Sequence, residues 1–330
     1  MSQVEIREVA EAEDGIRLDR WFKRHFPALA HGRLEKLLRT GQIRLDGHRA
    51  KANTRLEAGQ SLRIPPISGD APATQVQRTP PKISEADIDA LQESILYMDD
   101  DIIAINKAPG LAVQGGTGTH RHIDGMLDAL RFDAQDRPRL VHRLDRDTSG
   151  VLLIARNVRA AAELAAAFKA KTARKVYWAA VAGQPKPASG VIDLALDKQS
   201  GPRGERVVAD AEDGQAAITN YRTVDHAGGK VSWLVMEPLT GRTHQLRVHA
   251  EALGTPILGD PKYGERTASP RGEGIAKKLH LHARAIRLPR PGGEMLEVVA
   301  PLPAHMAATW RLFGFDERAE SNPFGFSGTT

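Results

Sequence analysis

The sequence contains no cysteine, and this absence excludes several kinds of protein chemistry at once. Disulfide frameworks, thiolate zinc or iron–sulfur sites and cysteine nucleophiles are all ruled out. The chain also lacks any apolar run near the roughly 20 residues that a membrane span requires, and its acidic start, Met1 to Gly15, has no apolar signal segment. We therefore expect a cytoplasmic protein without membrane contact.

Two ligand-binding patterns are also missing. Twelve histidines are present, but His280 and His282 stand two residues apart and His244 and His249 five apart, which is not the spacing of a helical metal site. The glycine-rich stretch 115–118 lacks the lysine of a phosphate-binding loop. The sequence therefore predicts no metal site and a mobile loop at 115–118.

Positive charge is concentrated near the N-terminus. The whole chain carries a formal charge of +5, whereas Ile16 to Ile64 alone carries +8 and Met1 to Gly15 carries −4. A charge run is commonly just a solvated face. An excess of this size within 49 residues instead indicates a polyanionic partner, most simply nucleic acid.

The basic segment predicts two short helices and a small sheet. Apolar residues recur at helical spacing in 18–26 and 34–38, and we expect their aromatic members to form a core. Two strands, 43–45 and 62–64, follow, the first ending in an Asp46-Gly47 hairpin turn. This order resembles the S4 domain, an RNA-binding module. The resemblance implies RNA contact by the basic outer face, which carries Arg17, Arg20, Lys23, Arg24, Arg33, Lys36, Arg39 and Arg44.

The stretch His142 to Gly150 is the strongest candidate for a functional site. It places Asp145 and Asp147 among Arg143 and Arg146 and then runs directly into an apolar segment, so it is a polar loop entering a strand. Loops held by a rigid strand often carry catalytic side chains, and neighbouring guanidinium groups keep a carboxylate ionised. The alternative is a surface turn with solvated ion pairs, which are common and weak.

His142-Arg143-Leu144-Asp145 closely resembles the catalytic loop of the pseudouridine synthases, specifically of the RluA family. Two later segments resemble the same family, namely Lys175-Val176-Tyr177 and Leu239 to His249, whose arginine falls on Arg247. The resemblance spans roughly Ile16 to Met306. It implies an α+β pseudouridine synthase fold, with a large mixed, mainly antiparallel sheet, flanking helices and a central active-site cleft, besides a small α/β S4 domain.

The resemblance also implies roles for individual residues. Asp145 is the essential carboxylate, Tyr177 packs against the flipped base and assists proton transfer, and Arg247 keeps Asp145 ionised and oriented. Without the resemblance, a strand tyrosine is usually a packing residue and Arg247 would be a surface charge of a helix. A stacked base must leave the stack to be reached. Further substrate contacts are expected from His142, Arg143, which would fill the gap left by the base, Arg146, Thr148, Gly241, Arg242, His244 and Gln245.

The implied reaction detaches uracil from C1′, turns it and rejoins it through C5, without a metal or nucleotide cofactor. Asp145 either adds covalently to the substrate or removes a sugar proton, and the sequence does not distinguish the two routes. Among the family's branches the chain most resembles the large-subunit synthase C branch, which acts on 23S ribosomal RNA, with the D branch as the neighbouring possibility.

Two other classes of function stay open at this point. One is a catalytically inactive RNA-binding or ribosome assembly factor, which would bind RNA without forming product. The other is a glycosidase that uses Asp145 with Asp147, and it requires the two carboxylates to lie roughly 5 to 9 Å apart.

The chain is expected to have five parts. These are an N-terminal tail (1–15), the S4 domain (16–67), a linker (68–88), the catalytic domain (89–316) and a flexible C-terminal tail (317–330). The linker mixes Pro, Ser, Thr and Gln without periodicity. We expect the protein to be a monomer.

Overall fold

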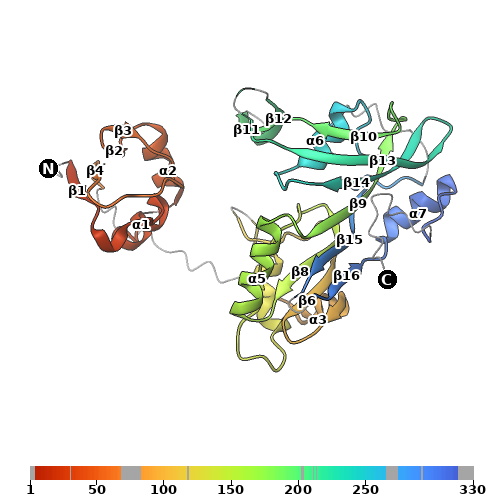
Figure 1. Ribbon diagram of the computed structural model, residues 1–330, viewed down its shortest axis with the longest axis horizontal. Helices are drawn as coiled ribbons and strands as arrows, with labels where there is room; N and C mark the ends of the chain where they lie inside the picture. Colours follow the sequence, from red (N-terminus) through yellow and green to blue (C-terminus); the bar gives the residue numbers. More distant parts are fainter. Residues whose placement is uncertain are drawn as a thin grey trace. The chain divides into compact units, whose positions relative to one another are not determined.

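The computed structural model describes residues 4–29, 31–67, 83–116, 119–201, 204–210, 212, 214–264, 274–290 and 293–318. The chain divides into two compact units, 1–79 and 80–330, and each is described by itself (Figure 1). Most of the predicted linker and of the predicted C-terminal tail lies outside the described residues. No helix in the described ranges is long and apolar enough to span a membrane.

The first unit packs two helices against a small sheet. Its elements are β1 (Glu5–Glu8), η1 (Glu11–Glu13), α1 (Leu18–His25), α2 (His31–Arg39), β2 (Arg44–Leu45), β3 (His48–Arg49) and β4 (Ser61–Ile64). The strand order is β1-β4-β2-β3. Trp21 and Phe22 are buried among leucines of both helices, as the helical periodicity predicted. Asp46 and Gly47 both have positive φ, which is the turn expected of an Asp-Gly hairpin.

The predicted N-terminal tail, 1–15, is wrong. β1 pairs antiparallel with β4, from Glu5 opposite Ile64 to Glu8 opposite Ser61. Glu13 is buried and accepts a hydrogen bond of 2.8 Å from the indole nitrogen of Trp21. β1 is an edge strand with both faces largely exposed, so it lacks the apolar alternation by which a strand is found in a sequence.

The second unit is built on one large sheet with helices packed against it (Figure 1). Its strands are β5 (Ile95–Met98), β6 (Ile102–Lys107), β7 (Arg139–Leu140), β8 (Ser149–Ala155), β9 (Arg174–Ala182), β10 (Ser189–Asp193), β13 (Ile218–Ala227), β14 (Val231–Pro238), β15 (Leu281–Pro289) and β16 (Met295–Val299). The main order is β10-β13-β14-β9-β15-β8-β6-β5, with β16 beside β15 and β7 beside β8. Every described pairing of these strands is antiparallel except β15 with β8, so the predicted mixed, mainly antiparallel sheet is confirmed.

The remaining elements of this unit cover the sheet or extend from it. They are α3 (Glu85–Glu93), α4 (Ile123–Met126), η2 (Leu127–Leu130), α5 (Val158–Lys169), α6 (Gln245–Ala252), α7 (Ala304–Phe313) and the hairpin β11 (Leu196–Gly201) with β12 (Gly204–Ala209). Alternate residues of β8 face opposite sides of the sheet: Val151 and Leu153 pack toward α5, and Leu152 and Ile154 toward α3 and α4. Since both faces are covered, β8 is buried throughout, and its residues 151–155 are all apolar instead of alternating.

The predicted start of the catalytic domain at residue 89 is wrong by about one helical turn. α3 begins at Glu85, inside the predicted linker, and the Ser84 side chain caps it by accepting a hydrogen bond from the Asp87 amide at 3.2 Å. Leu91 of this helix is buried against η2 and β6. The residues before Ser84 are rich in proline, and the predicted linker was therefore extended over the Ser84 cap and the first residues of the helix.

The parallel contact of β8 with β15 depends on a glycine. Gly150 has φ +108°, and a Cβ atom there would lie 2.2 Å from the carbonyl oxygen of Ala283, so no other residue fits without a backbone shift. Next to it, Ser149 lies opposite His282 and the Ser149 Oγ is 2.9 Å from His282 Nδ1. The C-terminal end of the stretch His142 to Gly150 is thereby fixed to β15.

Three histidines of this unit are held neutral. Burial lowers the pKa of His142 to about 3, that of His280 to about 4 and that of His282 to about 3. Each ring is hydrogen-bonded in its neutral form: His142 Nε2 accepts from the Leu153 amide, and His280 Nε2 lies 2.8 Å from Thr309 Oγ1. The folded unit therefore binds fewer protons than the unfolded chain below the ordinary histidine pKa.

We predict that the free energy of unfolding falls as the pH is lowered from about 6.5 toward 5, by up to about 1.4 kcal/mol per pH unit for each histidine. The sign follows because only the unfolded state takes up these protons in that window. Urea unfolding at a series of pH values measures the slope. His282→Gln should reduce it, whereas His226→Gln, which changes an exposed hairpin residue, should not. A midpoint that stays constant over this range would contradict the prediction.

Candidate active site

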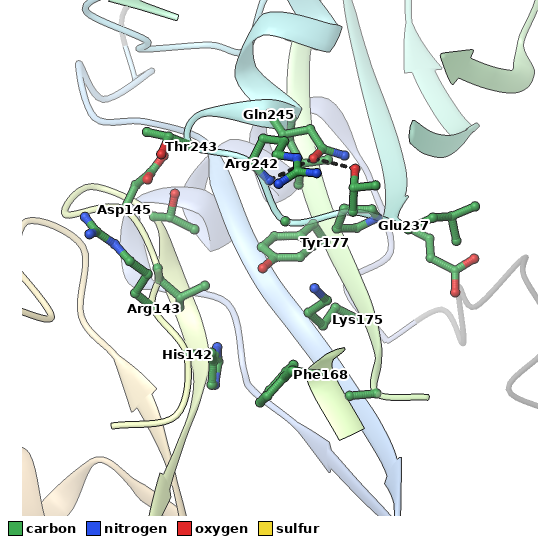
Figure 2. A pocket seen from close by; sticks show the side chains of 18 of the residues that line it. His142, Arg143, Asp145, Phe168, Lys175, Tyr177, Glu237, Arg242, Thr243 and Gln245 are labelled. Carbon is green, nitrogen blue, oxygen red and sulfur yellow. Dashed lines mark hydrogen bonds between the residues drawn. The ribbon is translucent and has the colours of Figure 1, made fainter. Parts of the chain in front are cut away.

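A cleft of about 830 Å³ opens in the second unit beside β9 (Figure 2). Asp145, Tyr177 and Arg247, which come from three separate segments, all line it, as predicted. The other expected contact residues that line it are His142, Arg143, Thr148, Gly241, Arg242, His244 and Gln245. Arg146 does not line the cleft. Its side chain is exposed and lies 3.4 Å from Asp147, so its predicted substrate contact is not supported.

Asp145 lies on the loop before β8, with an arginine and a histidine beside it. Its Oδ2 atom is 3.6 Å from Arg247 Nη1 and 3.8 Å from His244 Nε2. Its backbone carbonyl accepts a hydrogen bond from the Thr148 amide, which closes the loop as a turn. About a fifth of the side chain remains accessible, at 22% relative exposure, so the carboxylate faces the cleft and can meet a ligand.

Arg247 is held mainly by a second carboxylate, Asp260, which sequence reasoning missed. Its Nε and Nη2 atoms donate to the two oxygens of Asp260, each at 2.7 Å, and both side chains are almost fully buried. The contact of Arg247 with Asp145 is therefore not two-pronged, because Asp260 occupies the guanidinium fork. Only Nη1 remains directed at Asp145, so Asp260 orients Arg247 and Arg247 supplies the positive field.

Burial and pairing oppose each other at Arg247. Burial lowers its pKa, but the hydrogen bonds and the charge of Asp260, with a smaller part from Asp145, raise the pKa further, and the net shift is upward. Arg247 is therefore permanently charged. Its guanidinium also stacks over the ring of Tyr263 at 4.9 Å, which fixes its plane.

His244 bridges Asp145 to a tyrosine. It is the N-cap of α6 and has φ +54°. His244 Nδ1 lies 2.7 Å from the hydroxyl of Tyr263, and that oxygen accepts a hydrogen bond from the Val207 amide. When the Tyr263 hydroxyl donates to Nδ1, a neutral His244 carries its proton on Nε2, the ring nitrogen that lies 3.8 Å from Asp145.

Two residues expected to contact the substrate use their polar atoms within the protein. His142 Nε2 accepts from the Leu153 amide at 2.8 Å, and its ring lies 4.7 Å from Phe168. Gln245 donates to the Ile218 carbonyl and accepts from the Arg242 amide, both at 3.0 Å. Both side chains shape the cleft wall and also hold the backbone, and their direct contact with the substrate stays a prediction.

Lys107 anchors the Asp145 loop through a backbone carbonyl. Its fully buried ammonium donates to three carbonyl oxygens, those of Ala108, Leu111 and Arg146, at 2.9 to 3.0 Å. The Gly110 amide donates to the same Arg146 carbonyl. Burial lowers the pKa of Lys107 to about 7 against the opposing fields of Asp147 and Asp145. The Lys107 ammonium and the Gly110 amide thus both hold the carbonyl of Arg146, the residue that follows Asp145.

The acidic groups of the cleft do not form a pair of catalytic carboxylates. Asp147 is not among the residues that line it. Glu237 does line it, but it is paired with Arg174 at 2.7 Å and accepts from Asn220 at 3.2 Å. The glycosidase alternative is therefore not supported. Over the ranges that the structure describes, no group of three His, Asp or Glu side chains is arranged to hold a metal ion.

Tyr177 carries a neutral phenol in the cleft. Burial, reinforced by the negative charge of Asp145, raises the pKa of Tyr177, so its hydroxyl stays protonated at neutral pH. In Figure 2 this hydroxyl points toward the loop that carries Arg143 and Asp145. The arrangement places one carboxylate, one phenol and one fixed guanidinium around a single cleft.

Loss of Arg247 should destabilise the protein, because it leaves the buried charge of Asp260 without a partner. We predict that Arg247→Met lowers the free energy of unfolding by about 3 to 5 kcal/mol. Arg247→Lys should recover little of this loss, since an ammonium cannot bond both Asp260 oxygens in the same geometry. Urea unfolding gives both values.

Arg206→Met is the matched control for this prediction. Arg206 also lies over the Tyr263 ring, at 5.2 Å, but it is exposed and pairs with the half-exposed Glu251. It should cost less than about 1 kcal/mol. Equal losses in Arg206→Met and Arg247→Met would show that the Asp260 pair contributes nothing special.

The sequence was compared with known proteins. An RNA pseudouridylate synthase profile matches residues 101–252. Over 293 residues the chain is 37% identical to the ribosomal large subunit pseudouridine synthase C of Rickettsia typhi, with 87% of this chain and 94% of that protein covered. It is 34% identical over 308 residues to the protein of the same name from Vibrio cholerae, with 92% and 95% covered.

Solved structures agree with this result. The human RNA pseudouridylate synthase domain containing 4 superposes with a TM-score of 0.58 at 29% identity and covers 69% of this chain and 95% of its own. The human RNA pseudouridylate synthase domain containing 1 superposes with a TM-score of 0.53 at 32% identity and covers 65% of this chain and 86% of its own. The expected pseudouridine synthase fold is thereby confirmed. The chain belongs to the RNA pseudouridylate synthase family and is an isomerase that converts uridine to pseudouridine.

Proposed function

We propose that this enzyme modifies uridines of 23S ribosomal RNA, with Asp145 as its essential carboxylate. The relatives from Rickettsia typhi and Vibrio cholerae are named for the large ribosomal subunit and are covered over almost their whole length. The observation that carries the catalytic assignment is the convergence of Asp145, Tyr177 and Arg247 in one cleft. A synthase of the D branch, with other target uridines, is the alternative within the family.

The geometry supports a division of roles in the reaction. The target base must leave its stack to enter the cleft, and the exposed Arg143 at its edge is placed to fill the gap. Asp145 then adds to the nucleotide or removes a sugar proton, and the fixed charge of Arg247 stabilises the carboxylate throughout. After uracil has rejoined through C5, the C5 proton must leave.

Tyr177 assists this last step as a relay. Because its phenol is protonated, it accepts the C5 proton only while it passes its own proton to the Asp145 carboxylate, toward whose loop its hydroxyl points. No metal or nucleotide cofactor takes part in these steps. The expected cytoplasmic location and monomeric state stay predictions.

Asp145→Asn keeps the shape of the side chain and removes its charge and nucleophilicity. We predict that turnover falls by several orders of magnitude while RNA affinity is retained. Pseudouridine mapping on 23S RNA incubated with purified enzyme measures product, and mapping in a strain that lacks the protein identifies the target uridines. Asp147→Asn, two residues away and outside the cleft wall, should stay within about tenfold of wild type.

Near-normal product from a contamination-checked Asp145→Asn sample would refute the catalytic assignment. RNA binding by the wild-type protein without any product would instead favour the inactive assembly factor.

We also propose that the first unit is an S4 RNA-binding domain. Its two helices and small sheet follow the order expected of that module. All eight candidate contact residues are exposed, namely Arg17, Arg20, Lys23, Arg24, Arg33, Lys36, Arg39 and Arg44. Arg17 also pairs with Asp19 at 2.6 Å, and Arg44 donates to the Gly41 and Gly47 carbonyls, so these two are partly committed to the fold.

The helical cations of this unit should set much of the salt dependence of RNA binding. Changing Lys23, Arg24, Lys36 and Arg39 together to Gln should reduce the slope of log affinity against log salt by about 0.7 to 0.9 for each phosphate that the protein no longer neutralises. The control changes Arg49, Lys51, Arg55 and Arg63, which removes the same charge elsewhere in the unit. Equal slopes for the two variants would show that the helical face makes no specific RNA contact.

A further inference from the structure

The cleft continues past the catalytic residues to the corner where α5 ends and β9 begins. Its lining there includes Lys169, Lys171, Arg174 and Lys175, and one carboxylate, Glu237. Glu237 is committed to Arg174 and Asn220. Within the part of the chain that the structure describes, none of the three lysines is paired with a carboxylate. This corner therefore keeps a net positive charge that the protein does not neutralise.

Lys175 is the cation that lies deepest in this corner. It stands two residues before Tyr177 on β9, so both side chains leave the same face of the strand, about 7 Å apart. Its ammonium lies 5.9 Å from the centre of the Phe168 ring, and Figure 2 shows it beside Tyr177 in the cleft. Burial lowers the pKa of Lys175. A partly desolvated cation without a counter-charge is costly, and a bound anion would compensate it.

Lys171 provides a second and independent observation. It follows the C-cap of α5, Ala170, and has φ +59°, a left-handed conformation that glycine normally adopts at this position. The Lys171 and Thr172 amides close the helix end by bonding to the Phe168 and Ala167 carbonyls, so the conformation is fixed. A lysine therefore lines the cleft at a position where the backbone conformation favours glycine.

We propose that this lysine corner, formed by Lys169, Lys171 and Lys175, holds the backbone phosphates that flank the target uridine. The proposal rests on the proposed function, because it takes RNA as the substrate. Lysine suits a phosphate as a compact point charge with three donors. Lys175 acts as a positioning residue. By holding the phosphate it sets the ribose relative to Asp145, and it does not touch the reacting atoms.

The first experiment compares Lys175→Met with Lys230→Met in the full-length enzyme. Lys230 is an exposed lysine of the β13–β14 hairpin that does not line the cleft, so it controls for the loss of one charge. Lys175→Met should lower kcat/KM on 23S RNA by about 10 to 100-fold and reduce its salt slope by about 0.7 to 0.9. Lys175→Arg should restore most of the slope. Identical slopes for Lys175→Met and Lys230→Met would overturn the proposal.

The second experiment removes the charge from the RNA instead. A 23S RNA fragment with a mapped target uridine is made with an uncharged methylphosphonate on either side of that uridine. Wild-type enzyme should lose about tenfold or more in single-turnover rate, and Lys175→Met should lose little further, because its partner is already gone. Equal losses in the two proteins would overturn the phosphate contact. If wild-type enzyme converts no uridine in full-length unmodified 23S RNA, so that no target can be mapped, the proposed function fails instead.

The third experiment uses the strain at Lys171. Lys171→Gly relieves the left-handed backbone, so Tm should rise by about 1 to 3 °C. If the lysine serves the RNA, kcat/KM should nevertheless fall by about three- to tenfold with a smaller salt slope. Lys171→Asn is the control for the added flexibility of glycine, because asparagine tolerates the same left-handed backbone. A more stable Lys171→Gly with unchanged kcat/KM and slope would remove Lys171 from the site.

Discussion

The parallel contact between β8 and β15 is the constraint on which the rest of the structure depends. It inserts β15 between the strand that follows the Asp145 loop and the strand that carries Tyr177. Neighbouring strands lie about 4.8 Å apart, so this insertion places β8 and β9 about 10 Å apart within the sheet. The Asp145 loop and Tyr177 therefore reach the cleft from strands that are not direct neighbours. Gly150 makes the insertion possible, since any Cβ there would collide with Ala283.

Around the cleft, several polar side chains hold other groups of the protein in place. Lys107 and Gly110 hold the Arg146 carbonyl, His142 holds the Leu153 amide, and Asp260 holds Arg247. Each bond removes a degree of freedom from the loop or from the guanidinium that face the substrate. Groups held in place before reaction need little reorganisation as charge develops, which is the main source of electrostatic catalysis.

Sequence patterns were sufficient for α1, α2, β4 and β8 and for the three residues that meet in the cleft, because these follow from apolar periodicity and from motif resemblance, but they missed the exposed edge strand β1. They could not identify Asp260, because no local sequence pattern indicates that it pairs with Arg247, thirteen residues earlier in the chain. They also assigned Gln245 and His142 to the substrate. A polar residue in a motif can serve the backbone as well as a ligand, and only tertiary contacts distinguish the two.

Under the two proposals, positive charge in this protein acts in two different ways. Cations of the first unit do not line the catalytic cleft, so RNA contacts made by them would contribute equally to the ground state and the transition state and would favour capture without speeding the chemical step. Cations of the lysine corner lie within the cleft itself, and Lys175 stands on the same strand as Tyr177. A phosphate held there fixes the ribose against Asp145, and small errors in such placement are costly in rate. The same type of side chain therefore provides affinity in one unit and alignment in the other.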